Sequence, residues 1–170
     1  MRGLASRGMR PFFHFIILVT LTLFLSGCVS SGTRSVHDTG MFAPVSVRLH
    51  PVFSKISDWS GDGKPDGIEA LVELRDQFGD PCKARGQFVF ELFEYQAQAP
   101  DPRGKRLVNP WIGSIKTVDE QRQRWNFASR CYLFRLELDR IKESSSYVMS
   151  VSFEPVGGSR LFDQFVIGKR

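Results

Sequence analysis

The sequence predicts an all-β protein, a single antiparallel β-sandwich of about seven strands with one short helix. Short runs of alternating apolar and polar residues recur from residue 44 to the C-terminus, with the period expected of half-buried strands. Turn-forming segments rich in Gly, Ser and Pro separate several of these runs. The balance of 42% hydrophobic and 24% charged residues over 170 is that of one packed globular domain.

Six segments show the alternation most clearly. In one of them Met149 and Val151 alternate with Ser150, so that one face is apolar and the other polar. Polar segments at 143–146 and 155–159 fit hairpin loops between such strands. The predicted strands are 45–50, 88–93, 111–117, 132–139, 147–153 and 161–167.

One short helix is predicted near residues 118–129. Thr117 and Glu120 have the spacing of a capping box, in which the threonine hydroxyl accepts a helix amide and the glutamate reaches back. Val118 and Trp125 then fall near one face of the helix. We therefore expect Trp125 to pack this helix against an edge or end of a sheet.

The segment 67–79 fits either a helix or a strand by its own periodicity. The residues Leu-Arg-Asp-Gln-Phe-Gly-Asp-Pro at 74–81, followed by Gln-Phe-Val-Phe at 87–90, resemble the strand–Asp-x-x-Gly-x-Pro–strand signature of bacterial Ig-like and transthyretin-like sandwich domains. The resemblance implies a strand over 68–76. It implies no activity, because such sandwiches serve many functions.

Residues 1–27 have the pattern of a secretory signal. Three arginines precede an apolar run of 15 residues, which is shorter than the roughly 20 residues needed to span a bilayer. The run ends at Leu25-Ser26-Gly27-Cys28, which resembles the lipobox of bacterial lipoproteins. The resemblance implies cleavage before Cys28, a diacylglyceryl thioether on its sulfur and an acylated new N-terminus. The alternative is a plain secretory signal with a chance cysteine at its end.

The chain then divides into a lipoprotein signal peptide at 1–27, a tether at 28–43 and the β-sandwich domain at 44–170. The tether is rich in Ser, Thr and Gly, so we expect it to be flexible. Several acyl chains on one cysteine anchor a protein stably, whereas a single chain binds marginally. Val29 rather than Asp follows Cys28, which in this family implies the outer membrane, facing the periplasm.

The formal net charge of +5 owes much to the predicted signal. Without Arg2, Arg7 and Arg10, Lys+Arg falls from 23 to 20 against 18 acids, which leaves +2. A nucleic-acid-binding surface needs a clustered excess of positive charge. We therefore expect a membrane partner through Cys28 and no nucleic acid.

The segment 58–69 resembles a calcium-binding loop of the Asp-x-Asp-x-Asp-Gly type. Oxygen donors at regular positions can wrap around one cation, and Gly63 permits the sharp turn. Because a strand is predicted to follow, the last acid could point away from the metal. The alternative is a solvated turn held by side-chain hydrogen bonds to its own backbone. The predicted ligands of a structural calcium ion are Asp58, Ser60, Asp62, Lys64, Asp66 and Glu69.

Two cysteines remain after Cys28, namely Cys82 and Cys131. An extracytoplasmic compartment permits a disulfide, so a bond between them is predicted if their Cα atoms approach within about 7 Å. The alternative is two separately buried thiols.

Catalytic motifs are missing from the sequence. His37 and His50 are the only histidines after residue 27, and neither has zinc-site spacing. No nucleophile elbow or phosphate-binding glycine loop is present. We predict a non-catalytic binding or envelope-structural lipoprotein, whose partner is a protein or an anionic envelope component. The alternatives are an accessory subunit of a secretion or envelope-assembly complex and an envelope hydrolase with an unrecognised site.

Two basic groups are the predicted contact surfaces. One lies in the long segment 96–110, and the other surrounds Trp125, where guanidinium groups beside an aromatic ring can bind an anion. The alternative for both is an ordinary solvated face. The residues are Arg103, Lys105, Arg106, Arg122, Arg124, Trp125 and Arg130.

Overall fold

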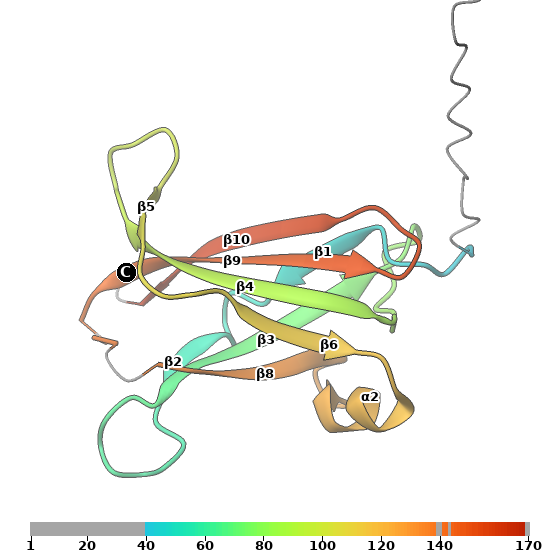
Figure 1. Cartoon of the computed structure of the whole chain (residues 1–170), viewed down its shortest axis with the longest axis horizontal. Helices are drawn as coiled ribbons and strands as arrows, with labels where there is room; N and C mark the ends of the chain where they lie inside the picture. The colour runs from blue at the N-terminus through green and yellow to red at the C-terminus, as the bar shows by residue number, and fades with distance from the viewer. Residues whose placement is uncertain (1–39, 139–140, 143, 169–170) are drawn as a thin grey trace, which may run out of the picture. The chain divides into compact units, whose positions relative to one another are not determined.

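The computed structural model describes residues 40–138, 141–142 and 144–168, which form two antiparallel sheets packed together (Figure 1). The all-β sandwich predicted from the alternation of the sequence is confirmed. The predicted signal peptide, the lipobox at Cys28 and most of the tether lie outside the described residues.

The first sheet contains β1 (Ser46–Leu49), β2 (Lys55–Ser57), β3 (Gly67–Arg75), β7 (Trp125–Asn126) and β8 (Cys131–Glu137). β3 lies at its centre. On one side it pairs with β2 near its start and with β1 near its end, and on the other side it pairs with β8. The order across the sheet is therefore β1 and β2, then β3, β8 and β7.

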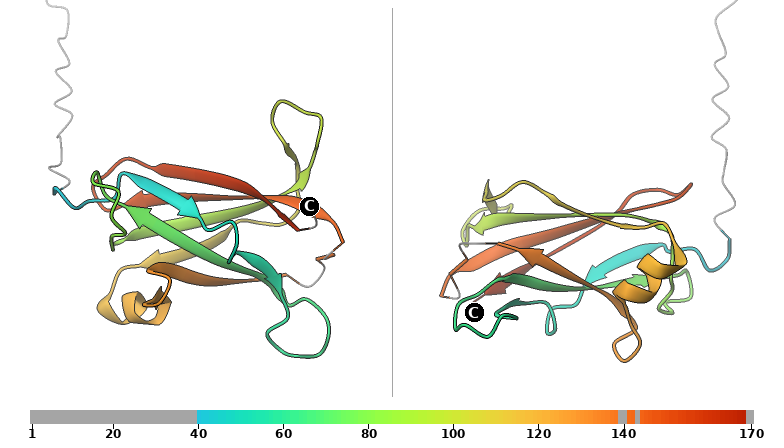
Figure 2. Two further views of the ribbon diagram at one scale, coloured as in Figure 1. Left: turned by 180° about the vertical axis from the view of Figure 1, so that it is seen from behind. Right: turned by 60° about the horizontal axis from the view of Figure 1, so that its bottom comes forward.

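The second sheet contains β4 (Gly86–Tyr95), β5 (Arg103–Arg106), β6 (Trp111–Ile115), β9 (Ser146–Pro155) and β10 (Leu161–Gly168). β4 pairs with β9 along one edge, while β5 and β6 share its other edge. β10 pairs with β9 and ends the sheet. Figure 2 shows the two sheets from behind and from below.

The ambiguous segment 67–79 forms the strand β3. Ile68, Ala70, Val72 and Leu74 are all fully buried, which is the two-residue period of a strand face. The described residues form ten strands where about seven were predicted, and the three additional ones, β2, β5 and β7, have only three, four and two residues. Such short strands show no recognisable alternation. β5 also lies inside the long segment 96–110, which is outside the predicted strands.

The core between the sheets is built on aromatic rings. The ring of Phe88 lies with its centroid 4.4 Å from that of Phe153, 5.0 Å from Phe134 and 5.5 Å from Tyr132. Gly113 on β6 packs under the same cluster, because a Cβ at that position would lie 2.5 Å from a ring carbon of Phe134. The close approach of β6 to the core therefore requires glycine.

The helix α2 (Val118–Arg124) begins as predicted and ends earlier. The Thr117 side chain accepts a hydrogen bond from the Glu120 amide, and the Glu120 side chain accepts one from the Thr117 amide, so the capping box is confirmed. The helix ends at Arg124 because Trp125 and Asn126 pair with β8. Trp125 is 9% exposed and meets the Tyr132 ring edge-on at 5.2 Å. It thus fixes α2 to the edge of the first sheet.

The connections between strands gather at two ends of the sandwich. We call one the Gly40 end: it comprises residues 40–45, 76–85, 116–130 and 155–160 and includes α2. The other, the far end, carries the β2–β3 loop, the β4–β6 segment with β5, and the β8–β9 connection (Figure 1).

Candidate functional site

A lysine lies on two aromatic rings at the Gly40 end. The Lys83 Nζ is 4.6 Å from the centroid of the Trp125 ring and 5.3 Å from that of Phe127. Lys83 comes from the β3–β4 connection, and the two aromatic residues come from the segment that follows α2. Trp125 is nearly buried, whereas Phe127 is 78% exposed. The ammonium group is therefore held at the surface by attraction to two ring faces.

A pocket of about 500 Å³ lies beside this lysine, between the β3–β4 connection and the start of α2. Behind two of its lining residues, the hydroxyl of the buried Tyr132 donates to Gln121 Oε1 at 2.7 Å and accepts from the Ala84 amide at 3.1 Å. Burial raises the pKa of Tyr132, so this hydroxyl stays protonated. The Gln121 Nε2 is buried and has no hydrogen-bond partner among the described residues.

The charged side chains around the pocket are positive. Lys83, Arg85 and Lys116 line it, are exposed, and form no ion pair within the described residues. The nearby Glu120 carboxylate is occupied by the amides of Lys116 and Thr117, which hold its pKa below the usual range. We call this site, defined by Lys83, Arg85, Lys116 and Gln121, the Lys83 pocket. Its chemistry suits an anionic group.

The arginines predicted near Trp125 only partly join this site. Arg124 lies with its guanidinium carbon 5.0 Å from the centroid of the Phe134 ring, and Arg122 pairs with Asp119 at 3.4 Å. Arg130 is exposed and has a backbone φ of 55°, in the left-handed region. The Lys83 pocket itself was missed in the sequence, because its cations come from two connections far apart in the chain.

The other predicted basic group lies at the far end, on or beside β5. Arg103 forms a two-pronged ion pair with Asp101 at 2.8 Å, and Arg106 pairs with Glu91 at 3.0 Å. The two arginines are therefore neutralised locally, and Lys105 alone of this group forms no ion pair within the described residues. The structure places the two predicted basic groups at opposite ends of the sandwich, as two separate surfaces.

The predicted calcium loop is closed by its own backbone. The Asp58 carboxylate accepts hydrogen bonds from the amides of Gly61 at 2.6 Å and Gly63 at 2.8 Å, which lower its pKa. Asp66 accepts the amides of Trp59 and Ser60, both at 2.7 Å.

The other two acids of the loop are engaged as well. Asp62 accepts the Lys64 amide at 2.8 Å, and Glu69 lies in β3, 3.3 Å from Arg135. Within the described ranges, no three His, Cys, Asp or Glu side chains form a metal-binding group. These contacts match the alternative of a turn held by hydrogen bonds to its own backbone, and the calcium site stays a prediction.

Cys82 and Cys131 are free thiols in the structure. Cys82 packs against the core, whereas Cys131 precedes the inward-facing Tyr132 on β8, so their side chains lie on opposite faces of the sheet. The Cys131 Sγ donates to the Ser129 carbonyl at 3.2 Å. Burial raises the pKa of both thiols, that of Cys82 to about 11. The predicted disulfide is not formed in this arrangement.

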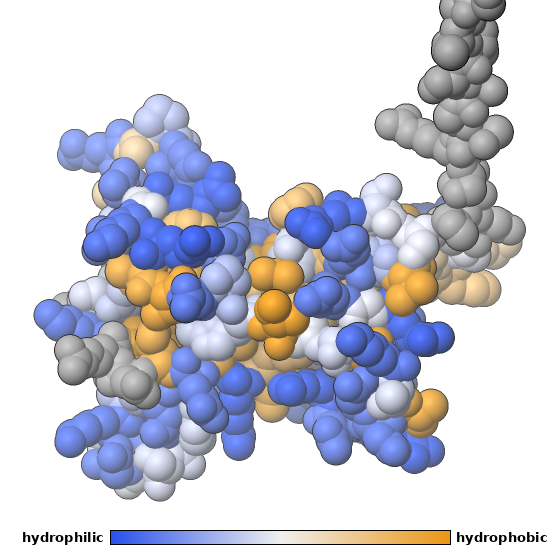
Figure 3. Space-filling view, in the orientation of Figure 1, coloured by the Kyte–Doolittle hydropathy of each residue, from blue (hydrophilic) through white to orange (hydrophobic). Residues whose placement is uncertain are grey.

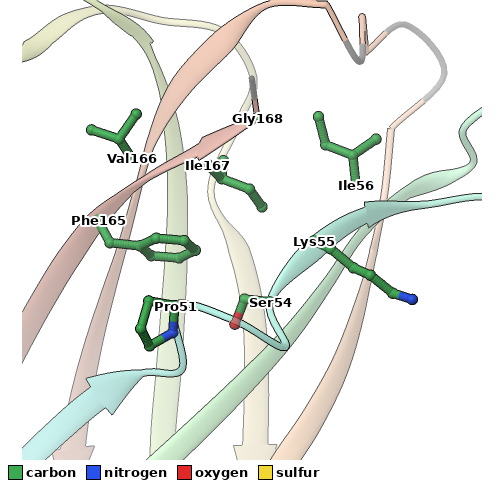
Figure 4. Close-up of a pocket in the computed structure, with 8 residues that line it drawn as sticks. All are labelled: Pro51, Ser54, Lys55, Ile56, Phe165, Val166, Ile167 and Gly168. Atoms are coloured by element: carbon green, nitrogen blue, oxygen red, sulfur yellow. The ribbon is translucent and has the colours of Figure 1, made fainter. Parts of the chain in front are cut away.

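A second pocket lies where edges of the two sheets meet. It has a volume of about 430 Å³ and is lined by Pro51, by residues 54–56 and by the end of β10. Phe165 and Ile167 extend from β10 toward Pro51 and Ser54 (Figure 4). Five of its eight lining residues have apolar side chains, and Lys55 supplies its one ionisable side chain. This arrangement suits an apolar side chain better than a charged ligand.

Comparisons with family models, with curated proteins and with solved structures found no match for this chain. In the described part of the chain, no helix has both the length and the apolar character needed to cross a membrane.

Proposed function

We propose that the protein is a lipid-anchored module of the bacterial cell envelope, with a β-sandwich outside the cytoplasm that acts by binding or support and not by catalysis. The observation that carries this proposal is Leu25-Ser26-Gly27-Cys28, placed directly after a basic stretch and an apolar run.

The Lys83 pocket supports a binding role for the sandwich. Three exposed cations line a space of about 500 Å³, which suits a phosphate or carboxylate of an envelope component. The aromatic rings beneath Lys83 hold its ammonium group in place before a ligand arrives. This arrangement fits an anionic partner better than a neutral one.

Lipid anchoring can be tested directly on the protein from cell membranes. Mass spectrometry of the N-terminal peptide is expected to show a diacylglyceryl group and an acyl chain on a peptide that begins at Cys28. The Cys28→Ser variant is expected to lack both. An unmodified peptide that begins at Met1 would refute the proposal.

A second candidate function is an accessory subunit that pairs through a sheet edge. β10 ends the second sheet, and no strand among the described residues pairs with its outer edge. An added strand could place an apolar side chain in the pocket beside Phe165 and Ile167. Such a partner should copurify in fixed ratio, and Val166→Lys should release it, because edge lysines oppose strand addition. Ile112→Lys, on a 67% exposed residue of β6, is the matched control.

A further inference from the structure

The Gly40 end of the sandwich exposes an unusual number of large apolar side chains. Seven of the thirteen exposed large hydrophobic residues in the described chain belong to its connections, so they are concentrated there. Scattered apolar residues are normal on a surface, whereas a concentration of them marks a contact site. They are Met41, Phe42, Val45, Phe78, Val118, Phe127 and Val156, which are 55% to 78% exposed.

These residues come from separate connections but lie in linked groups. The ring centroids of Phe42 and Phe78 are 6.2 Å apart. The Lys83 ammonium contacts the rings of both Phe127 and Trp125. One pocket joins residues 43–44 and Val156 to the segment 83–85, and the Lys83 pocket joins that segment to Val118. The apolar residues and the cations therefore occupy one continuous surface. Figure 3 shows hydrophobic residues interspersed among hydrophilic ones at this end.

The same end has a surplus of positive charge. Asp119 is paired with Arg122, Glu154 with Arg160, and Glu73 with Arg75. The Glu120 carboxylate accepts hydrogen bonds in the capping box, and Asp76 is buried. Asp80 is the remaining acid at this end, and it is exposed and forms no ion pair in the described chain. The cations without an ion pair there are Lys83, Arg85, Lys116, Arg124 and Arg130.

The short sequence distance between this surface and Cys28 indicates that its partner is the membrane. Gly40, the first described residue, belongs to this end, and Cys28 precedes it by only twelve residues. Twelve residues span at most about 40 Å, even when fully extended. If Cys28 carries lipid, the bilayer is held within this reach at a high effective concentration. A modest affinity of this surface for the bilayer is then enough to hold the Gly40 end against the membrane.

We propose that the Gly40 end docks onto the anionic phospholipid bilayer that holds the anchor, an inference that rests on the proposed lipidation of Cys28. Lys83, Arg85 and Lys116 contact lipid phosphates at the Lys83 pocket. Phe127 and Phe78 enter the interfacial layer, where aromatic side chains combine with cations in peripheral membrane proteins. The far end, with the 58–66 loop and β5, then faces away from the membrane.

Depth-dependent quenching of a fluorophore on the lipidated full-length protein tests this orientation. The fluorophore is attached through Ala128→Cys at the Gly40 end or, as the matched control, through Ala97→Cys at the far end; both alanines are exposed. The protein is reconstituted into vesicles of phosphatidylcholine with or without roughly 30% phosphatidylglycerol, each containing a nitroxide-labelled lipid. Flotation with the vesicles reports the anchor separately.

Two charge-reversed variants isolate the role of the cations. One carries Lys83→Glu, Arg85→Glu and Lys116→Glu; the other carries Lys64→Glu, Lys105→Glu and Lys142→Glu at the far end. All six residues are exposed and form no ion pair in the described chain, but Lys83→Glu also removes the contact of the Lys83 ammonium with the Trp125 and Phe127 rings. We therefore expect the Gly40-end variant to melt somewhat below the parent and to stay folded at the temperature of the assay, and the far-end variant to melt like the parent. A circular dichroism melt of each checks this.

On anionic vesicles we expect quenching at position 128 to exceed that at position 97 by about threefold or more. The difference should disappear on phosphatidylcholine alone and in the Gly40-end variant, and it should persist in the far-end variant. Equal quenching at both positions in protein that floats with the vesicles would overturn docking and leave the anchor intact. Protein that does not float would overturn the anchor, and the docking proposal with it.

Discussion

The carboxylate of Asp163 on β10 accepts a hydrogen bond of 2.7 Å from the backbone N–H of Leu49 on β1. The next amide, that of His50, donates to Leu71 on β3, so the Leu49 N–H points away from β3 toward the open edge of its sheet. The bond therefore joins the edge strands of the two sheets. It also satisfies an amide that would otherwise lie unpaired at the seam.

Removing this carboxylate should destabilise the sandwich. Asp163→Ala leaves the Leu49 amide without a partner, and we expect the free energy of unfolding to fall by about 1.5–3 kcal/mol, as for hydrogen bonds to charged groups. Asp163→Asn keeps an acceptor and should cost less. Urea denaturation followed by circular dichroism measures both, with Gln164→Ala on the exposed face of β10 as a control expected within about 0.5 kcal/mol of the parent. An Asp163→Ala variant as stable as this control would show that the bond contributes nothing.

Gly113→Ala tests the close approach of β6 to the core. The added Cβ would lie 2.5 Å from a ring carbon of Phe134, so the strand or the ring must move, at a cost of about 1–3 kcal/mol. Gly40→Ala is the matched control, because a Cβ there meets nothing within 4 Å. Adding Phe134→Leu to Gly113→Ala should recover part of the loss relative to the sum of the single variants. Full additivity in thermal or urea unfolding would contradict the steric explanation.

The elements that the sequence predicts well are those with a local cause. The alternation along β8 and β9, and the Thr117–Glu120 capping box, depend on neighbouring residues alone, and the structure contains all three. The two-residue β7 depends on pairing with β8, which no local pattern indicates. The pairing of β7 also ends α2 at Arg124. The capping box marks where the helix begins and contains no information on where it ends.

The candidate site is harder to predict from the sequence, because its residues come from segments that are far apart in the chain and meet only in the folded sandwich. Lys83 and Phe127 are 44 positions apart in the chain, yet their side chains meet across the β3–β4 connection and the segment after α2. Conversely, Arg106 and Arg122 are only 16 positions apart and lie at opposite ends of the sandwich. Grouping basic residues by sequence distance therefore selected two surfaces and missed the Lys83 pocket.

The two interpretations of the 58–66 loop differ in their response to calcium. Because Asp58 and Asp66 already bind amides of their own loop, we expect the same melting temperature in millimolar calcium and in chelator. Asp62→Asn should then have little effect in either buffer. A melting temperature that rises with calcium, and does so less in Asp62→Asn, would instead support the calcium site predicted from the sequence.

The thiol content distinguishes the predicted disulfide from the two thiols of the structure. In the full-length Cys28→Ser chain, unfolded without reductant, we expect two reactive thiols per molecule, from Cys82 and Cys131. Ellman's reagent provides the count, and a reduced sample of the same chain provides the reference value. A count near zero that rises to two after reduction would establish the disulfide and contradict the arrangement of β8 described above.

The stability of the fold should depend on alkaline pH through Cys82. Burial first, and then the charge of Asp76, raise the pKa of this thiol from 9.0 to about 11 in the folded chain. A group with a raised folded-state pKa contributes stability that is complete below its unfolded value and is lost as the pH rises through its folded value. We therefore expect the Cys82 contribution to hold up to about pH 9 and to decline from there to about pH 11. Urea midpoints at pH 8 and pH 10.5 should differ more in the parent than in Cys82→Ala, whereas an equal difference in both would show that Cys82 is not the titrating group.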